Sequence, residues 1–96
     1  MKYFHRTTVP PDDVIAQATA YFGPRLTLTE EATRRRRFAG TVGQLTVSAV
    51  PEGGHYTVVT VETNQPGESE LDKVAKRFLG EVHALAEPTH ALRGGY

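Results

Sequence analysis

The chain has 96 residues, no cysteine, and 11 basic against 11 acidic side chains, so its formal net charge at pH 7 is zero. One domain fits this length. The composition excludes a disulfide framework and a cysteine-based zinc site, and the balanced charge argues against a nucleic-acid partner. The first residues lack the apolar stretch of a secretory signal, and no segment is apolar enough to cross a membrane, so we expect a cytoplasmic protein.

The first predicted elements are a strand and a helix. Residues 2–9 are rich in aromatic and β-branched side chains, which favour a strand. Pro10 and Pro11 suit a helix start, because the first turn does not need their missing amide protons. Gly23 and Pro24 then end the helix. Its predicted apolar face consists of Val14, Ile15, Ala18, Tyr21 and Phe22.

The middle of the chain predicts four further strands joined by tight turns. The turns contain glycine and proline, at residues 40–43 and 51–54 in particular, where a hairpin needs unusual backbone angles. Apolar and polar side chains alternate between the turns, as in half-buried strands. The predicted strands are residues 25–31, 34–39, 44–50 and 55–63.

A long amphipathic helix is predicted over residues 69–87, after the last strand. Ser69 and Asp72 form a capping pair for its first turn, and Pro88 ends it. Its apolar stripe consists of Leu71, Val74, Ala75, Phe78, Leu79, Val82, Leu85 and Ala86.

The predicted fold class is α+β, in the order strand, helix, four strands, helix. Successive strands joined by tight turns must pair antiparallel, which gives an antiparallel sheet of about five strands. Both helices need an apolar surface, so we expect them to pack on one face of the sheet. We expect the domain to span residues 1–87 and residues 88–96 to form a flexible tail.

This order of elements resembles a shortened helix-grip domain of the START and polyketide-cyclase group. The similarity covers about residues 3–86 and includes the Pro10-Pro11-x-x-Val14 pattern and the turn Pro51-Glu52-Gly53-Gly54. In that group a long helix lies across a curved sheet and often encloses an apolar ligand. The same order is similar to one half of the TATA-binding-protein fold.

The resemblance implies a non-enzymatic binding domain that holds a small apolar or amphipathic ligand between the last helix and the sheet. Tyr21 or Tyr56 would orient a polar head of the ligand. The alternative for the apolar side chains is that they fill the core, because a short chain needs every large side chain there. The predicted lining residues are Phe78, Val82, Val59, Val61, Leu45 and Val47.

Four consecutive arginines, Arg34 to Arg37, are the most unusual local feature. Side chains alternate along a strand, so if Phe38 points into the core, Arg35 and Arg37 lie on the open face. That face could bind a partner protein, a second copy, an acidic ligand or a phosphate backbone, or it could be a solvated face whose charges discourage aggregation. Its predicted neighbours include Gln44, Thr46, Ser48, Tyr56, Thr60 and Glu62.

No enzyme motif is present in the sequence, and we predict no catalytic residue, metal site or cofactor. The histidines are scattered without ligand-like spacing. An acid–base or zinc site would require His5 and His55 to meet Glu62 within hydrogen-bond reach, or His83 to join Glu81.

Two expectations concern assembly and the tail. A small sheet with one open face gains stability by pairing, so we expect a homodimer. Residues 92–95, Leu-Arg-Gly-Gly, resemble the end of ubiquitin-like modifiers, although Tyr96 would have to be removed before the two glycines could be used.

Overall fold

The computed structural model describes residues 1–86, so the predicted tail lies outside the described residues. Five strands and two helices follow one another in the predicted order, which confirms the α+β fold class. Within the described part, no helix is long and apolar enough to span a membrane. The elements are β1 (Lys2–Thr7), α1 (Pro11–Phe22), β2 (Thr27–Ala32), β3 (Arg35–Gly40), β4 (Gly43–Glu52), β5 (Tyr56–Thr63) and α2 (Glu70–Ala86).

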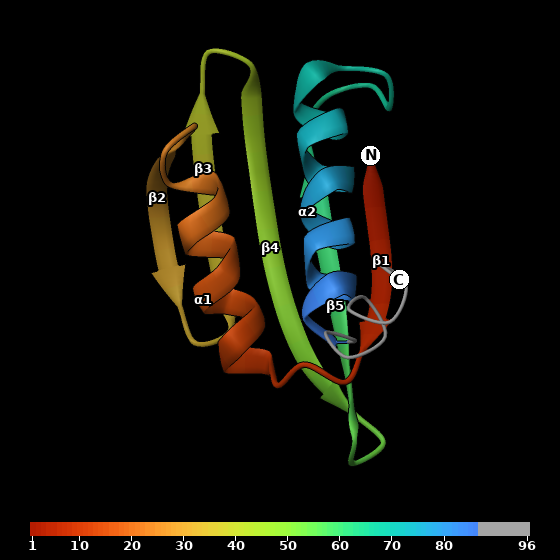
Figure 1. Ribbon diagram of the computed structural model, residues 1–96. Helices are drawn as coiled ribbons and strands as arrows, with labels where there is room; N and C mark the ends of the chain where they lie inside the picture. The colour runs from red at the N-terminus through yellow and green to blue at the C-terminus, as the bar shows by residue number, and fades with distance from the viewer. Residues whose placement is uncertain (87–96) are drawn as a thin grey trace, which may run out of the picture.

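The strands form one antiparallel sheet in the order β1-β5-β4-β3-β2. The four strands from β2 to β5 form a meander, and β1 pairs with β5 at one edge. Both helices lie on the same face: α1 lies over β3 and β4, and α2 lies over β5 and β1 (Figure 1). The molecule therefore has two layers, and the other sheet face carries no element of the described chain.

Helix α1 begins at Pro11, with Asp12 and Asp13 in its first turn, where negative charge complements the helix dipole. The chain turns at Gly23 and leads into Leu26, which is buried against the same core. The buried face of the helix consists of Val14, Ile15, Ala18 and Phe22.

Helix α2 begins with the predicted cap, because Ser69 Oγ accepts a hydrogen bond from the Asp72 amide at 3.1 Å. Most of the predicted stripe is buried or partly buried, but Leu85 is 47% exposed. This side chain faces a surface depression between the ends of the two helices, which Val9 and Ala16 also line. Helical spacing places Leu85 on the apolar stripe, but this spacing alone does not reveal where the covering layer ends.

The edge strand β2 departs from simple alternation. Leu28 pairs with Phe38, but the register shifts before Glu30, which pairs with Arg37. Leu28 is partly exposed at this edge, whereas Leu26 enters the core before the strand begins. The next strand starts at Arg35 because Arg34, with φ of 59°, lies in the hairpin turn.

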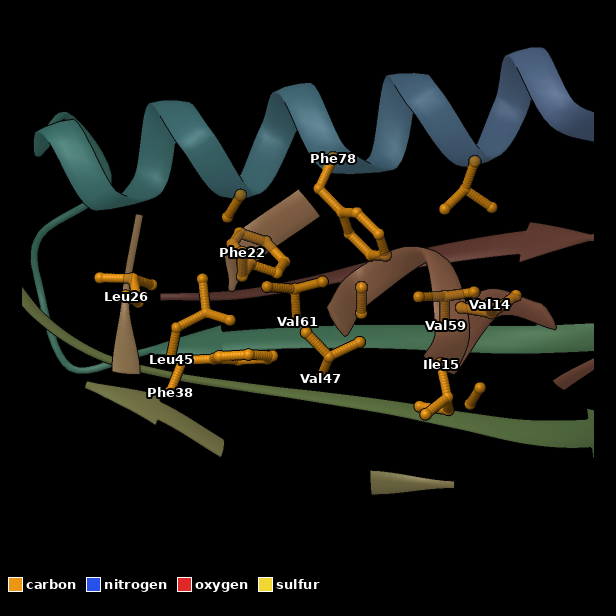
Figure 2. Close-up of a cluster of buried hydrophobic side chains, with 14 of the residues drawn as sticks. Val14, Ile15, Phe22, Leu26, Phe38, Leu45, Val47, Val59, Val61 and Phe78 are labelled. Atoms are coloured by element: carbon orange, nitrogen blue, oxygen red, sulfur yellow. The ribbon is translucent and has the colours of Figure 1, made fainter. Parts of the chain in front are cut away.

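Aromatic rings join the two helices to the sheet at the centre of the core (Figure 2). The Phe22 ring centroid lies 5.0 Å from that of Phe78 and 5.5 Å from that of Phe38. Three elements, α1, α2 and β3, therefore meet at one cluster, and all three rings are fully buried.

The core predicts that substitutions at two positions on α2 lower the free energy of unfolding by very different amounts. Phe78→Ala removes a fully buried ring and should lower the free energy of unfolding by about 3 to 5 kcal/mol. Leu85→Ala, the control on the same helix, should cost less than about 1 kcal/mol because its side chain is half exposed. Urea unfolding followed by circular dichroism measures both values, and equal losses would contradict the assigned core.

Candidate functional site

The predicted ligand-lining side chains lie together in the core. Six of them are each at most 1% exposed, and these six pack between α2 and the sheet (Figure 2). Tyr21 lies beside them, half-buried, with its ring 5.8 Å from that of Phe78 and the Arg25 guanidinium 4.4 Å from its ring centre. The six are Phe78, Val82, Val59, Val61, Leu45 and Val47.

The open sheet face carries a row of five side chains, four of them charged, that crosses all five strands. The register pairs Lys2 with Glu62, Glu62 with Thr46, Thr46 with Arg37, and Arg37 with Glu30. Directly paired residues point to the same face, so these five side chains form one line across the sheet. We call this line the charged row.

A second feature of the same face is a cluster of apolar side chains over β1, β5 and β4. Phe4, Val50 and Tyr56 are 67%, 55% and 48% exposed. Val58 connects them, because it pairs with Val50 and with Arg6, next to Phe4 on the same face of β1. We call these four residues the apolar patch.

The predicted interaction residues Arg35, Arg37, Tyr56 and Thr46 all lie on this open face, according to the register. The two arginines share one carboxylate: the Glu30 oxygens lie 3.8 Å from Arg35 Nη1 and 3.5 Å from Arg37 Nη1. Arg37 Nε also donates a 3.4 Å hydrogen bond to Thr46. The arginines are therefore compensated locally rather than forming a positive patch.

The other two arginines of the run lie away from this face. Arg34 Nε approaches Asp12 at 3.7 Å, which links the β2–β3 turn to the start of α1. Arg36 shares the core side of β3 with Phe38, and its Nε lies 3.3 Å from a Glu31 oxygen at the edge. Each arginine of the run thus has an acidic neighbour.

A polar cluster joins β1 and β5 to the first turn of α2. The Asp72 carboxylate is completely buried and accepts hydrogen bonds from Tyr3 Oη at 2.6 Å, Thr63 Oγ1 at 2.7 Å and Ser69 Oγ at 2.8 Å. Burial raises the pKa of Asp72, but these hydrogen bonds outweigh it and hold the pKa below its ordinary value. The carboxylate therefore stays ionised and fixes α2 to the sheet.

The same cluster affects Tyr3. The hydrogen bond to Asp72 raises the pKa of Tyr3 to about 12, with smaller contributions from burial and from the negative charge of Asp72. Because the folded pKa lies above the ordinary value of about 10, the neutral phenol stabilises the fold fully below pH 10. This contribution is lost as the pH rises towards 12.

The histidines do not form the constellation that an acid–base site requires. His5 pairs with Val59 and faces the helix layer, where its ring centroid lies 5.9 Å from that of His83. Glu62 points to the open face, and His55 lies in the turn before β5. Burial and the neighbouring His83 lower the pKa of His5. Among residues 1–86, no three acidic or histidine side chains are grouped to hold a metal ion.

Sequence reasoning missed three residues that matter here. Phe4 and Val50 were not predicted on the open face, although alternation places Phe4 between the polar Lys2 and Arg6. Asp72 was predicted as a helix cap, and nothing in its local pattern indicates that it is buried. Its burial follows from the position of Tyr3, 69 residues away in the chain.

Comparison with known proteins adds no functional information. No protein-family model matches the chain, and no curated protein shows significant sequence similarity to it.

The Asp72 cluster predicts a pH-dependent stability difference. Asp72→Asn should lower the free energy of unfolding by about 2 kcal/mol at pH 7, because hydrogen bonds to a buried charge are lost. The folded pKa of Asp72 is depressed, so its contribution is present above about pH 4 and disappears as the pH falls through the folded value. The gap between the two proteins should therefore narrow in acid, as measured by urea unfolding from pH 7 to pH 2.5.

Glu81→Gln is the matched control, because Glu81 lies exposed on the same helix. It should change stability by less than about 0.5 kcal/mol. A gap between wild type and Asp72→Asn that stays constant across this pH range would contradict the assigned role of the ionised carboxylate.

Proposed function

We propose that this chain is a small protein-interaction domain that binds its partner through the open sheet face. The observation that supports this proposal best is the exposed apolar patch, in which Phe4 and Val50 each leave more than half of their surface in solvent. Large apolar side chains that gather on one face mark sites of protein contact more often than scattered ones do.

The surroundings of the patch also fit a protein interface. Specific interfaces combine an apolar centre with a polar rim. Here the charged row lies beyond Phe4 on one side of the patch. The ion pair between Arg6 and Glu52, at 2.6 Å, crosses β5 beside Val58 and Tyr56, with the Arg6 guanidinium 5.8 Å from the centre of the Tyr56 ring. Phe4 and Tyr56 supply aromatic contact area, which is enriched at such interfaces.

A phosphate backbone fits this face less well. Nucleic-acid binding depends on cations that can neutralise phosphates. On this face Glu30 lies beside both Arg35 and Arg37, and Glu52 pairs with Arg6, so a phosphate would compete with a carboxylate for each arginine.

The alternative ligand site between α2 and the sheet would require the core to open. Phe78, Val59 and Val61 are fully buried, and the Phe78 ring lies against Phe22. A ligand at this position would have to displace these contacts, whereas a partner on the open face meets side chains that already face solvent.

Photo-crosslinking tests the proposal. p-Benzoylphenylalanine at position 56 replaces an exposed aromatic side chain of the open face, and the same group at position 77 marks the exposed side of α2 as a control. In cells that naturally express the chain, position 56 should give a discrete crosslinked species and position 77 should not.

The substitution Val50→Asp, added to the position 56 variant, should remove this species because it places a charge inside the apolar patch. Circular dichroism should show an unchanged fold, since Val50 is exposed. A crosslinking pattern equal at both positions, or one insensitive to Val50→Asp in a folded protein, would contradict the proposal.

A further inference from the structure

We propose that the partner of the open face is a second copy of this chain, packed face to face about a two-fold axis that runs parallel to β4. This inference rests on the proposed function and adds the identity and orientation of the partner. It follows from the order of charges in the charged row, which the strand register fixes.

The charged row reads positive, negative, neutral, positive, negative from β1 to β2: Lys2, Glu62, Thr46, Arg37 and Glu30. Thr46 stands at its centre, on the middle strand of the sheet. Reversing the row exchanges every positive position with a negative one. A row of this kind is complementary to its own reverse.

A two-fold axis parallel to β4 produces this reversal. It places β1 over β2 of the second copy and β5 over β3, while β4 faces β4. Lys2 then lies opposite Glu30 of the other copy, and Glu62 lies opposite Arg37. Because the axis is two-fold, each contact occurs twice, and four opposite-charge contacts form across one row.

The neighbouring rows agree with the same axis. The row that pairs Phe4, Thr60, Ser48, Arg35 and Ala32 places Phe4 over Ala32 of the second copy. Thr60 faces Arg35 and can accept a hydrogen bond from its guanidinium. In the row beyond, Val50 meets its own copy on the axis, which covers part of the apolar patch.

Like charges meet at one position on the axis. Glu52, at the far end of β4, faces its own copy, but Arg6 Nη2 lies 2.6 Å from its carboxylate within the chain. Two packed sheets also cross at about 30° because of their twist, which separates positions far from the centre.

The other in-plane axis, perpendicular to the strands, does not fit. It would place each strand over its own copy, so the β3 side chains Arg35 and Arg37 would face arginines of the second copy. Like charges brought together in this way oppose association. The charge order thus selects one orientation.

The size of the face indicates a weak dimer. Five strands spaced about 4.8 Å apart, each at least six residues long, give a flat area of roughly 24 by 20 Å on each copy. Two such areas lie near the lower limit for specific interfaces. We therefore expect a dissociation constant in the micromolar range, on the order of 1–100 μM.

Charge reversals test the orientation directly by sedimentation equilibrium. Glu62→Arg places two arginines opposite each other, and Arg37→Glu places two glutamates opposite each other. Each single variant should dimerise about tenfold more weakly than wild type, or worse. The double variant, Glu62→Arg with Arg37→Glu, restores opposite charges at the same contacts and should recover the homodimer.

Mixing the two single variants gives the most specific result. In the mixed pair, the arginine introduced at position 62 of one copy meets the glutamate introduced at position 37 of the other. The native Arg37 meets the native Glu62 at the symmetry-related contact, so all these contacts are attractive. An equimolar mixture should therefore form a heterodimer about as readily as wild type forms its homodimer, although each variant alone dimerises much more weakly. Glu81→Arg, a matched reversal on the exposed side of α2, should leave dimerisation unchanged.

Three results would overturn the inference. The first is a wild-type chain that stays monomeric at about 500 μM, well above the expected dissociation constant. The second is a dimer that is insensitive to both single reversals, and the third is a mixture without heterodimer from variants that circular dichroism shows to be folded. A monomeric wild type that still crosslinks a different protein through position 56 would overturn the second-copy partner while the proposed interaction face stands. If the wild type is monomeric and position 56 crosslinks no protein, both proposals fail.

Discussion

One-sided covering of the sheet is the constraint on which the rest of this structure depends. Both helices pack on the same face, so alternate side chains of the central strands are buried and their neighbours are left facing solvent. Val59 and Val61 therefore belong to the core, while Val58 beside them and Val50 opposite it belong to the surface. The antiparallel register then decides which surface residues become neighbours, and it creates both the charged row and the apolar patch.

The attachment of α2 to the sheet combines apolar and ionic contacts. Phe78 anchors the middle of the helix among aromatic rings, and Asp72 fixes its first turn to Tyr3 on β1 and Thr63 on β5. A buried carboxylate is tolerated there because three hydroxyl groups donate to it. These contacts also hold the edge strand β1, which carries Phe4 and Lys2 onto the open face.

Much of the fold follows from local patterns in the sequence. Two-residue alternation and glycine turns predict the strands, and helical spacing with Ser69 as cap predicts α2 within about a residue of its observed start. The open face was harder to predict, because the neighbours of Arg37 depend on pairing between strands that a single sequence does not state. For the same reason the burial of Asp72 was not predicted, since its partner Tyr3 lies at the other end of the described chain.

One measurement tests most directly the proposed packing of two open faces about an axis parallel to β4. Phe4 and Ala32 lie on opposite edge strands, about 19 Å apart within one chain at four strand spacings. An isotope-filtered nuclear Overhauser experiment on mixed labelled and unlabelled protein should detect contact between the Phe4 ring and the Ala32 methyl group of the other copy. A dimer in which Phe4 instead contacts Phe4 or a helix of the other copy would contradict the account.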